Sequence, residues 1–96
     1  MSVLTTFDES AWVDEQIARY GPVVGGEALR SLLGFRTAAA CQKARLLGQI
    51  NVAVFHIPGR QGIFAVTVEA CAWVLAQRRA AINAQLDGAS GEEVVP

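Results

Sequence analysis

The chain has 96 residues, of which 52% are hydrophobic and 18% are charged. A chain of this length forms one domain, and its core is large enough to fold without disulfides or a structural metal. No apolar run approaches the roughly 18 residues that cross a bilayer, and the N-terminus lacks the basic-then-apolar order of a signal peptide. We therefore expect a cytoplasmic protein with no membrane partner.

The formal net charge of −1 hides an uneven distribution. All eight basic residues lie between positions 19 and 79, where only Glu27 and Glu69 oppose them, so this segment carries a net charge of +6. The other seven acidic residues fall before or after it. The chain therefore has a cationic middle between anionic ends, and the middle is suited to a polyanionic partner such as nucleic acid.

Residues that could carry chemistry are few. Cys41 and Cys71 both fall in expected helices on or near apolar faces, as small buried residues do in a reducing compartment. A zinc site needs about four ligands at close spacing, which two distant cysteines and His56 do not supply. The sequence also offers no paired carboxylates and no activated nucleophile. We therefore expect no metal, no cofactor and no enzymatic activity.

The first expected helix covers residues 8–20. Asp8 or Ser10 can cap it, acidic residues gather toward its N-terminus, and Gly21 and Pro22 stop it. Its apolar residues repeat at helical spacing, and they are Val13, Ile17 and Tyr20. We favour a helix that packs on the domain with its acidic face in water. The alternative is a surface whose acidic residues meet the basic patch of a neighbouring protomer.

Residues 22–24 are expected to form a short extended link, with a brief strand as the alternative. The segment 26–48 is expected to form a helix, a tight turn and a second helix. Leu29, Leu32 and Leu33 make one apolar face of the first helix. Gly34 ends that helix, because glycine accepts the left-handed conformation that a helix C-terminus often needs. Thr37 can cap the second helix, which is expected to run from residue 38 to residue 47.

The second helix has two faces of different character. The expected inward face recurs at four- and three-residue spacing and comprises Ala40, Ala44 and Leu47. The expected outward face comprises Ala38, Gln42 and Arg45, with Ala39 and Lys43 at its flanks. Glutamine can pair with the major-groove edge of adenine and arginine with that of guanine, and an alanine methyl can lie against a thymine methyl. A polar face that merely contacts solvent is the alternative.

Residues 51–66 are expected to form a hairpin. The run 51–57 is rich in β-branched and aromatic residues and reads as a strand, residues 58–62 form the turn, and residues 63–66 return as the partner strand. Arg60 lies at the tip, has little to pack against there, and can reach a phosphate or the minor groove. His56 is at most a backbone contact. Helix, turn, helix and hairpin in this order predict a winged helix-turn-helix.

The last expected helix covers residues 68–86, with Thr67 as its cap. Trp73 and Val74 widen its apolar surface, and Arg78 and Arg79 add charge. Residues 88–96 mix glycine, serine, acid and valine without a period, which predicts a flexible tail. The domain is therefore expected to span residues 1–87.

This order of elements resembles the small excisionase and AlpA-like proteins, which are related to the MerR-type winged helix. The resemblance covers roughly positions 22 to 79. It rests on Leu32-Leu33-Gly34, on the hairpin Phe55-His56-Ile57-Pro58-Gly59-Arg60, and on Thr67-Val68-Glu69 leading into Ala72-Trp73-Val74-Leu75. It implies a DNA-binding protein of a mobile element that acts as a recombination directionality factor by bending attachment-site DNA. Many such proteins also regulate transcription, and a site-specific recombinase is the implied protein partner.

The sequence therefore predicts an α+β, mostly α, winged helix-turn-helix with an added N-terminal helix and a long C-terminal helix. We expect it to bind double-stranded DNA as an excisionase or transcriptional regulator, to associate with the nucleoid, and to self-associate on DNA. The expected DNA contacts are Arg36, Thr37, Ala38, Gln42, Lys43, Arg45 and Arg60. The alternative is a protein-interaction module in which the basic patch binds an acidic partner, with Trp12 and Trp73 as apolar anchors.

Overall fold

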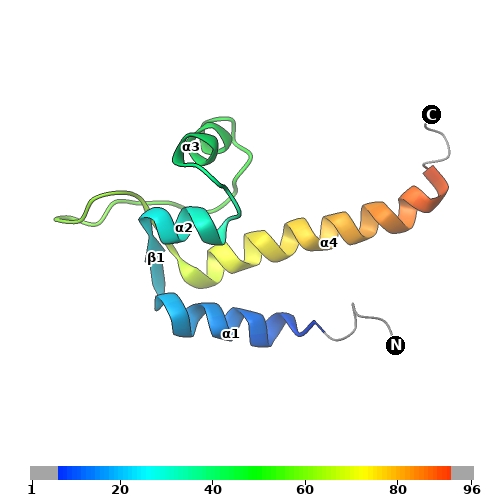
Figure 1. Cartoon of the computed structure of the whole chain (residues 1–96), viewed down its shortest axis with the longest axis horizontal. Helices are drawn as coiled ribbons and strands as arrows, with labels where there is room; N and C mark the ends of the chain where they lie inside the picture. Colours follow the sequence, from blue (N-terminus) through cyan, green and yellow to red (C-terminus); the bar gives the residue numbers. More distant parts are fainter. Residues whose placement is uncertain (1–6, 92–96) are drawn as a thin grey trace.

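A computed structural model describes residues 7–91 of the chain. Within that range the fold is α+β and mostly helical, with four α-helices and one two-stranded antiparallel sheet (Figure 1). The elements in chain order are α1 (Glu9–Tyr20), β1 (Val23–Gly25), α2 (Gly26–Leu32), α3 (Ala38–Leu46), β2 (Phe64–Val66) and α4 (Thr67–Gly91). The coarse fold class expected from the sequence is therefore confirmed.

Helix α1 lies beside α4 and runs antiparallel to it (Figure 1). Asp8 caps α1, because its carboxylate accepts a hydrogen bond from the backbone N–H of Ala11 at 3.0 Å. Near the start of α1, Glu9 forms ion pairs with Arg78 and Arg79 of α4. The guanidinium of Arg79, and that of Arg78 beside it, lower the pKa of Glu9. Helix α1 thus packs on the domain, as we favoured.

The α2–α3 connection is a tight turn held by side chains at both ends. Leu29 and Leu33 are buried, and Gly34 has a φ of 92°, a value that non-glycine residues rarely adopt. At the other end, the hydroxyl of Thr37 accepts the backbone N–H of Ala40 at 3.1 Å and caps α3. Both expectations, the glycine stop and the threonine cap, are confirmed.

The guanidinium of Arg30 spans the same turn from inside α2. Its Nη1 donates to the carbonyl oxygens of Phe35 at 3.1 Å and Arg36 at 2.7 Å. Its Nη2 lies 3.3 Å from a carboxylate oxygen of Glu27. One side chain therefore binds the backbone that leads into α3 and fixes the direction in which that helix leaves the turn.

The sheet differs from the expected hairpin. Strand β2 pairs with β1 in the register Val23↔Val66, Val24↔Ala65 and Gly25↔Phe64. The expected strand 51–57 is wrong, because this stretch is irregular apart from one antiparallel bridge between Phe55 and Phe64. Strand β2 has only three residues and pairs with β1 along one edge, so its other edge offers residues 51–57 little beyond the bridge to Phe55. Its apolar residue Val52 is instead buried in the core.

Helix α4 is longer than expected, since it begins at Thr67 and continues to Gly91. The expectation that Thr67 caps α4 is wrong. Its side chain is fully buried, and its hydroxyl donates to the carbonyl of Gly21 at 2.6 Å. Its backbone N–H donates to the carbonyl of Pro22 at 2.9 Å. Residues 88–91 of the expected tail are helical, whereas residues 1–6 and 92–96 lie outside the described part.

The core lies where α2, the sheet and the first turns of α4 meet. Val24, Leu29, Ala65 and Ala70 are among its most buried members. Both cysteines are free and buried, as expected for packing residues, and burial raises the pKa of the Cys71 thiol. Helix α3 lies at the edge of this core, contributes Cys41 and Ala44 to it, and contacts α2.

Candidate nucleic-acid interface

Helix α3 lies on the far side of α2 from α1 (Figure 1). Its buried residues are Cys41 and Ala44, whereas Ala40 and Leu47 of the expected inward face are exposed. The buried face of α3 is thus turned from the expected one toward Cys41, whereas Ala44 is buried as expected. The run Ala38-Ala39-Ala40 explains the error, because three consecutive alanines give the helix nearly equal apolar character on every side.

The rotation moves the expected outward stripe to the side of α3 that faces α2. Ala38, Gln42 and Arg45 line a groove with a cavity volume of about 610 Å³, whose other wall comes from α2 and from Gly62 and Ile63. Ala38 and Gln42 remain exposed at its rim. Arg45 is half-buried, and its Nε is covered without a hydrogen-bond partner among the described residues.

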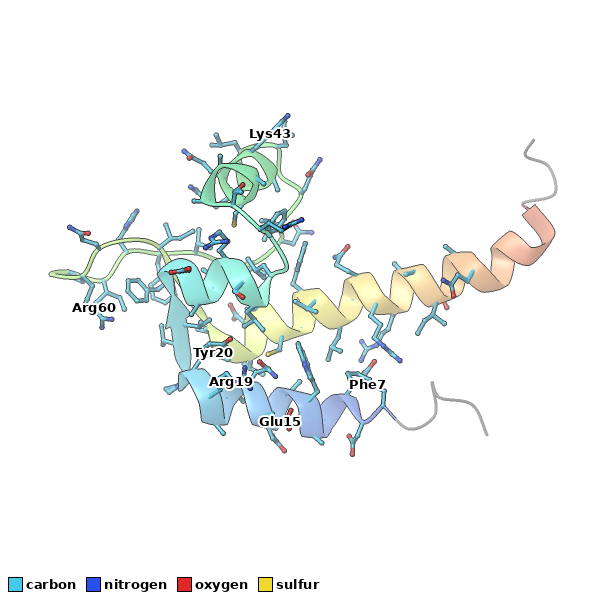
Figure 2. All side chains as sticks on the ribbon, in the orientation of Figure 1. Phe7, Glu15, Arg19, Tyr20, Lys43 and Arg60 are labelled. Atoms are coloured by element: carbon cyan, nitrogen blue, oxygen red, sulfur yellow. The ribbon has the colours of Figure 1, made fainter. Side chains whose placement is uncertain are left out.

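The outer face of α3 now carries a different set of residues. Figure 2 shows Lys43 directed away from the rest of the molecule. Two large apolar residues at the end of the helix are also exposed, Leu46 to 72% and Leu47 to 61%. Sequence reasoning missed both, because it assigned Leu47 to the core and left Leu46 without a role. Their position at the C-terminal end of the helix, just before Gly48, was the available signal.

Arg36 and Thr37 lie at the N-terminal entry of α3 and are exposed. The hydroxyl of Thr37 is occupied by its capping hydrogen bond, and the carbonyl of Arg36 by Arg30. The side chain of Arg36 forms no ion pair with any described residue. These positions place one available cation, Arg36, beside the first turn of α3 and a second, Lys43, on its outer face.

Arg60 lies on the loop that projects beyond α2, away from the body of the molecule (Figure 2). The end of this loop is a turn, in which the backbone N–H of Arg60 donates a 2.9 Å hydrogen bond to the carbonyl of Ile57. The loop is also spanned by a 3.2 Å contact between Nδ1 of His56 and the carbonyl of Gly62. Arg60 is exposed as expected, but it does have a packing partner, since its Cζ lies 5.1 Å from the ring centroid of Phe64.

The basic residues of the cationic segment therefore lie in separate parts of the structure. Arg78 and Arg79 share the single carboxylate of Glu9 on α1, and Arg30 contacts Glu27 and two backbone carbonyls at the turn. Arg36, Lys43, Arg45 and Arg60 belong to α3 with its preceding turn and to the projecting loop, and none of them forms an ion pair within residues 7–91. The structure thus places Ala38, Gln42, Lys43 and Arg45 on α3, Arg36 and Thr37 in the turn before it, and Arg60 on a separate loop.

In the described range, no three His, Cys, Asp or Glu side chains gather closely enough to hold a metal ion. None of the helices there combines the length and apolar character needed to cross a membrane. Comparison of the chain with protein-family models, with curated proteins and with solved structures gave no match.

Proposed function

We propose that the protein is a winged helix-turn-helix that binds double-stranded DNA, with α3 as its recognition helix and the loop of residues 55–64 as its wing. The observation that carries this proposal is the presentation of α3. A capped helix follows a tight turn whose backbone carbonyls accept hydrogen bonds from Arg30, and its outer face carries Lys43 with no other element of residues 7–91 over it.

The dimensions and side chains of α3 suit a major groove. Its nine residues extend about 13 Å along the helix axis. The diameter of an α-helix with its side chains, about 10 to 12 Å, fits the roughly 12 Å width of a B-DNA major groove. The alanines of its first turn leave the backbone free to approach base edges closely. In this proposal Gln42, which is exposed at the rim of the α2–α3 groove, pairs with a base, and Lys43 contacts a phosphate.

Arg45 has a smaller role in this proposal than the sequence predicted. Its half-buried guanidinium contributes positive charge from within the α2–α3 groove, and its substitution would also alter the packing of α3. Gln42 is therefore the sharper test of base reading. Gln42→Ala should lose about 1 to 3 kcal/mol on the cognate site and much less on unrelated DNA.

The direct test of DNA binding compares two charge-removing variants. Lys43 lies on the outer face of α3, whereas Arg19 is exposed on α1, on the other side of the molecule (Figure 2). Lys43→Ala should weaken binding to all sequences and lower the magnitude of the salt slope by about one unit, whereas Arg19→Ala should leave the slope unchanged. Affinity without salt dependence, or equal slopes in both variants, would contradict the proposal.

Within this function, we favour an excisionase that also regulates transcription, with a site-specific recombinase as partner and the nucleoid as its location. One small domain discriminates weakly against competing genomic sites, so several copies side by side on DNA are part of the proposal. Glu15 on the solvent side of α1 (Figure 2) is available for a neighbour's arginines, unlike Glu9. Footprinting on the DNA beside the gene, with Glu15→Lys as a test of cooperativity, examines both points.

A second candidate is supported by the apolar end of α3. Leu46 and Leu47 are more exposed than Trp12 and Trp73, which are half-buried and less suited to anchor a partner than the sequence implied. Large exposed apolar residues on a monomer mark contact surfaces, so a protein partner could bind here. Leu46→Ser should abolish capture of such a partner at high salt, where DNA binding by the cationic residues is weak.

A further inference from the structure

The ring of Phe64 occupies a fixed place between β1 and the projecting loop. Phe64 is buried, its backbone exchanges hydrogen bonds with Phe55 at 2.9 and 2.8 Å, and β2 sets it opposite Gly25. The ring lies directly over Gly25, where an added Cβ would overlap its atoms. Only glycine at this position of β1 leaves space for the ring. Gly25 on one side and the hydrogen bonds to Phe55 on the other therefore define the position of Phe64.

This fixed ring supports the guanidinium of Arg60. The Cζ–centroid distance of 5.1 Å is within the range of a cation–π contact, and the two side chains line the same hollow beside β1. A guanidinium is planar, and its five N–H donors point outward in its plane. Stacking uses the flat face of the group, so its donors remain available to an anion while its orientation is restricted.

We infer that Phe64 is a positioning residue, which holds the guanidinium of Arg60 in the orientation that contacts a DNA phosphate. This role rests on the proposed function, because it requires that the loop approach DNA. The reason for an effect on affinity is entropic. An arginine side chain has many rotamers, and one that is already oriented loses less freedom on binding than one that moves freely on a loop.

The test separates ring from charge with four variants. Arg60→Ala removes the charge, Phe64→Leu removes the ring but keeps an apolar side chain, Phe64→Tyr restores a ring, and Arg60→Ala/Phe64→Leu removes both. Duplex DNA affinity is measured for each, with the folded fraction checked by circular dichroism at the assay temperature. We expect Phe64→Leu to lower affinity about two- to fivefold, which is the range that an exposed cation–π contact supports.

Two further results are expected if the ring acts through Arg60. Phe64→Tyr should bind like the wild-type protein, and the double variant should bind no worse than Arg60→Ala alone, since without the arginine the ring has nothing to orient. Additive losses, or equal losses in the leucine and tyrosine variants, would overturn the positioning role.

A second measurement does not involve DNA. In the free protein, protons of the Arg60 side chain above the ring should show upfield NMR shifts that disappear in Phe64→Leu and persist in Phe64→Tyr. Absence of these shifts would overturn the stack itself. Wild-type protein that does not bind duplex DNA would overturn the proposed function, and the positioning role with it. Undiminished binding by folded Phe64→Leu would overturn the positioning role alone.

Discussion

Arg30→Met should lower stability through the α2–α3 turn. The side chain of Arg30 is only 20% exposed and donates from Nη1 to two backbone carbonyls, those of Phe35 and Arg36. Methionine keeps the apolar stem and removes the donors. Hydrogen bonds from a charged group contribute about 1.5 to 3 kcal/mol each. Because water can reach the carbonyl of the exposed Arg36 and replace part of this energy, we expect a net loss of about 1 to 2 kcal/mol.

The matched control is Glu27→Gln, which removes the ion pair and leaves both turn hydrogen bonds in place. The carboxylate of Glu27 is 83% exposed, so this pair should contribute less than about 0.5 kcal/mol. Urea denaturation measures both variants, with equal m values required for comparison. A loss in Arg30→Met below about 0.5 kcal/mol, or an equal loss in Glu27→Gln, would refute the reasoning that the turn contacts dominate.

Two other changes probe contacts that join distant parts of the chain. Thr67→Val should lower the free energy of unfolding by about 1 to 3 kcal/mol, because it leaves the carbonyl of Gly21 without its hydrogen-bond donor. Thr67→Ser keeps the hydroxyl and should retain the hydrogen bond. If urea denaturation shows a greater loss for the serine variant than for the valine variant, this prediction is wrong. The lowered pKa of Glu9 makes its contribution to stability present above its usual value of 4.5 and lost as the pH falls through the lowered pKa. The free energy of unfolding of Glu9→Gln should therefore fall less than that of the wild-type protein as the pH is lowered below 4.5. Identical pH profiles for the two proteins would count against the ion pairs with Arg78 and Arg79.

The sequence predicted best those features that depend on a single local interaction. The caps at Asp8 and Thr37 and the stop at Gly34 each follow from one side chain, or its absence, acting on a backbone group within a few residues. The buried face of α2 also followed from its leucines, since Leu29 and Leu33 leave one side of a short helix clearly apolar.

Features that depend on choices between distant partners were not predictable in the same way. Residues 51–57 have strand composition, but a ladder also needs a partner strand of similar length. Strand β2 has only three residues, pairs with β1 along one edge and bridges only Phe55 of this stretch on the other. The face of α3 was misassigned because alanine and cysteine differ little in apolar character, so tertiary packing decided between Ala40 and Cys41. The role of Arg30 was hidden because its partners are backbone carbonyls, which every residue has.

The two buried thiols have a practical consequence, because they lie in parts of the molecule with different packing. Cys41 lines the α2–α3 groove. Cys71 lies on α4 and is fully buried, and this burial raises the pKa of its thiol. A thiol-alkylating reagent reacts with the thiolate and needs access to it, so Cys71 should be modified only when the whole domain unfolds. Cys41 requires only that α3 separate from α2. The ratio of the two alkylation rates therefore measures the free energy of α3 opening against that of global unfolding, in one sample and without a label.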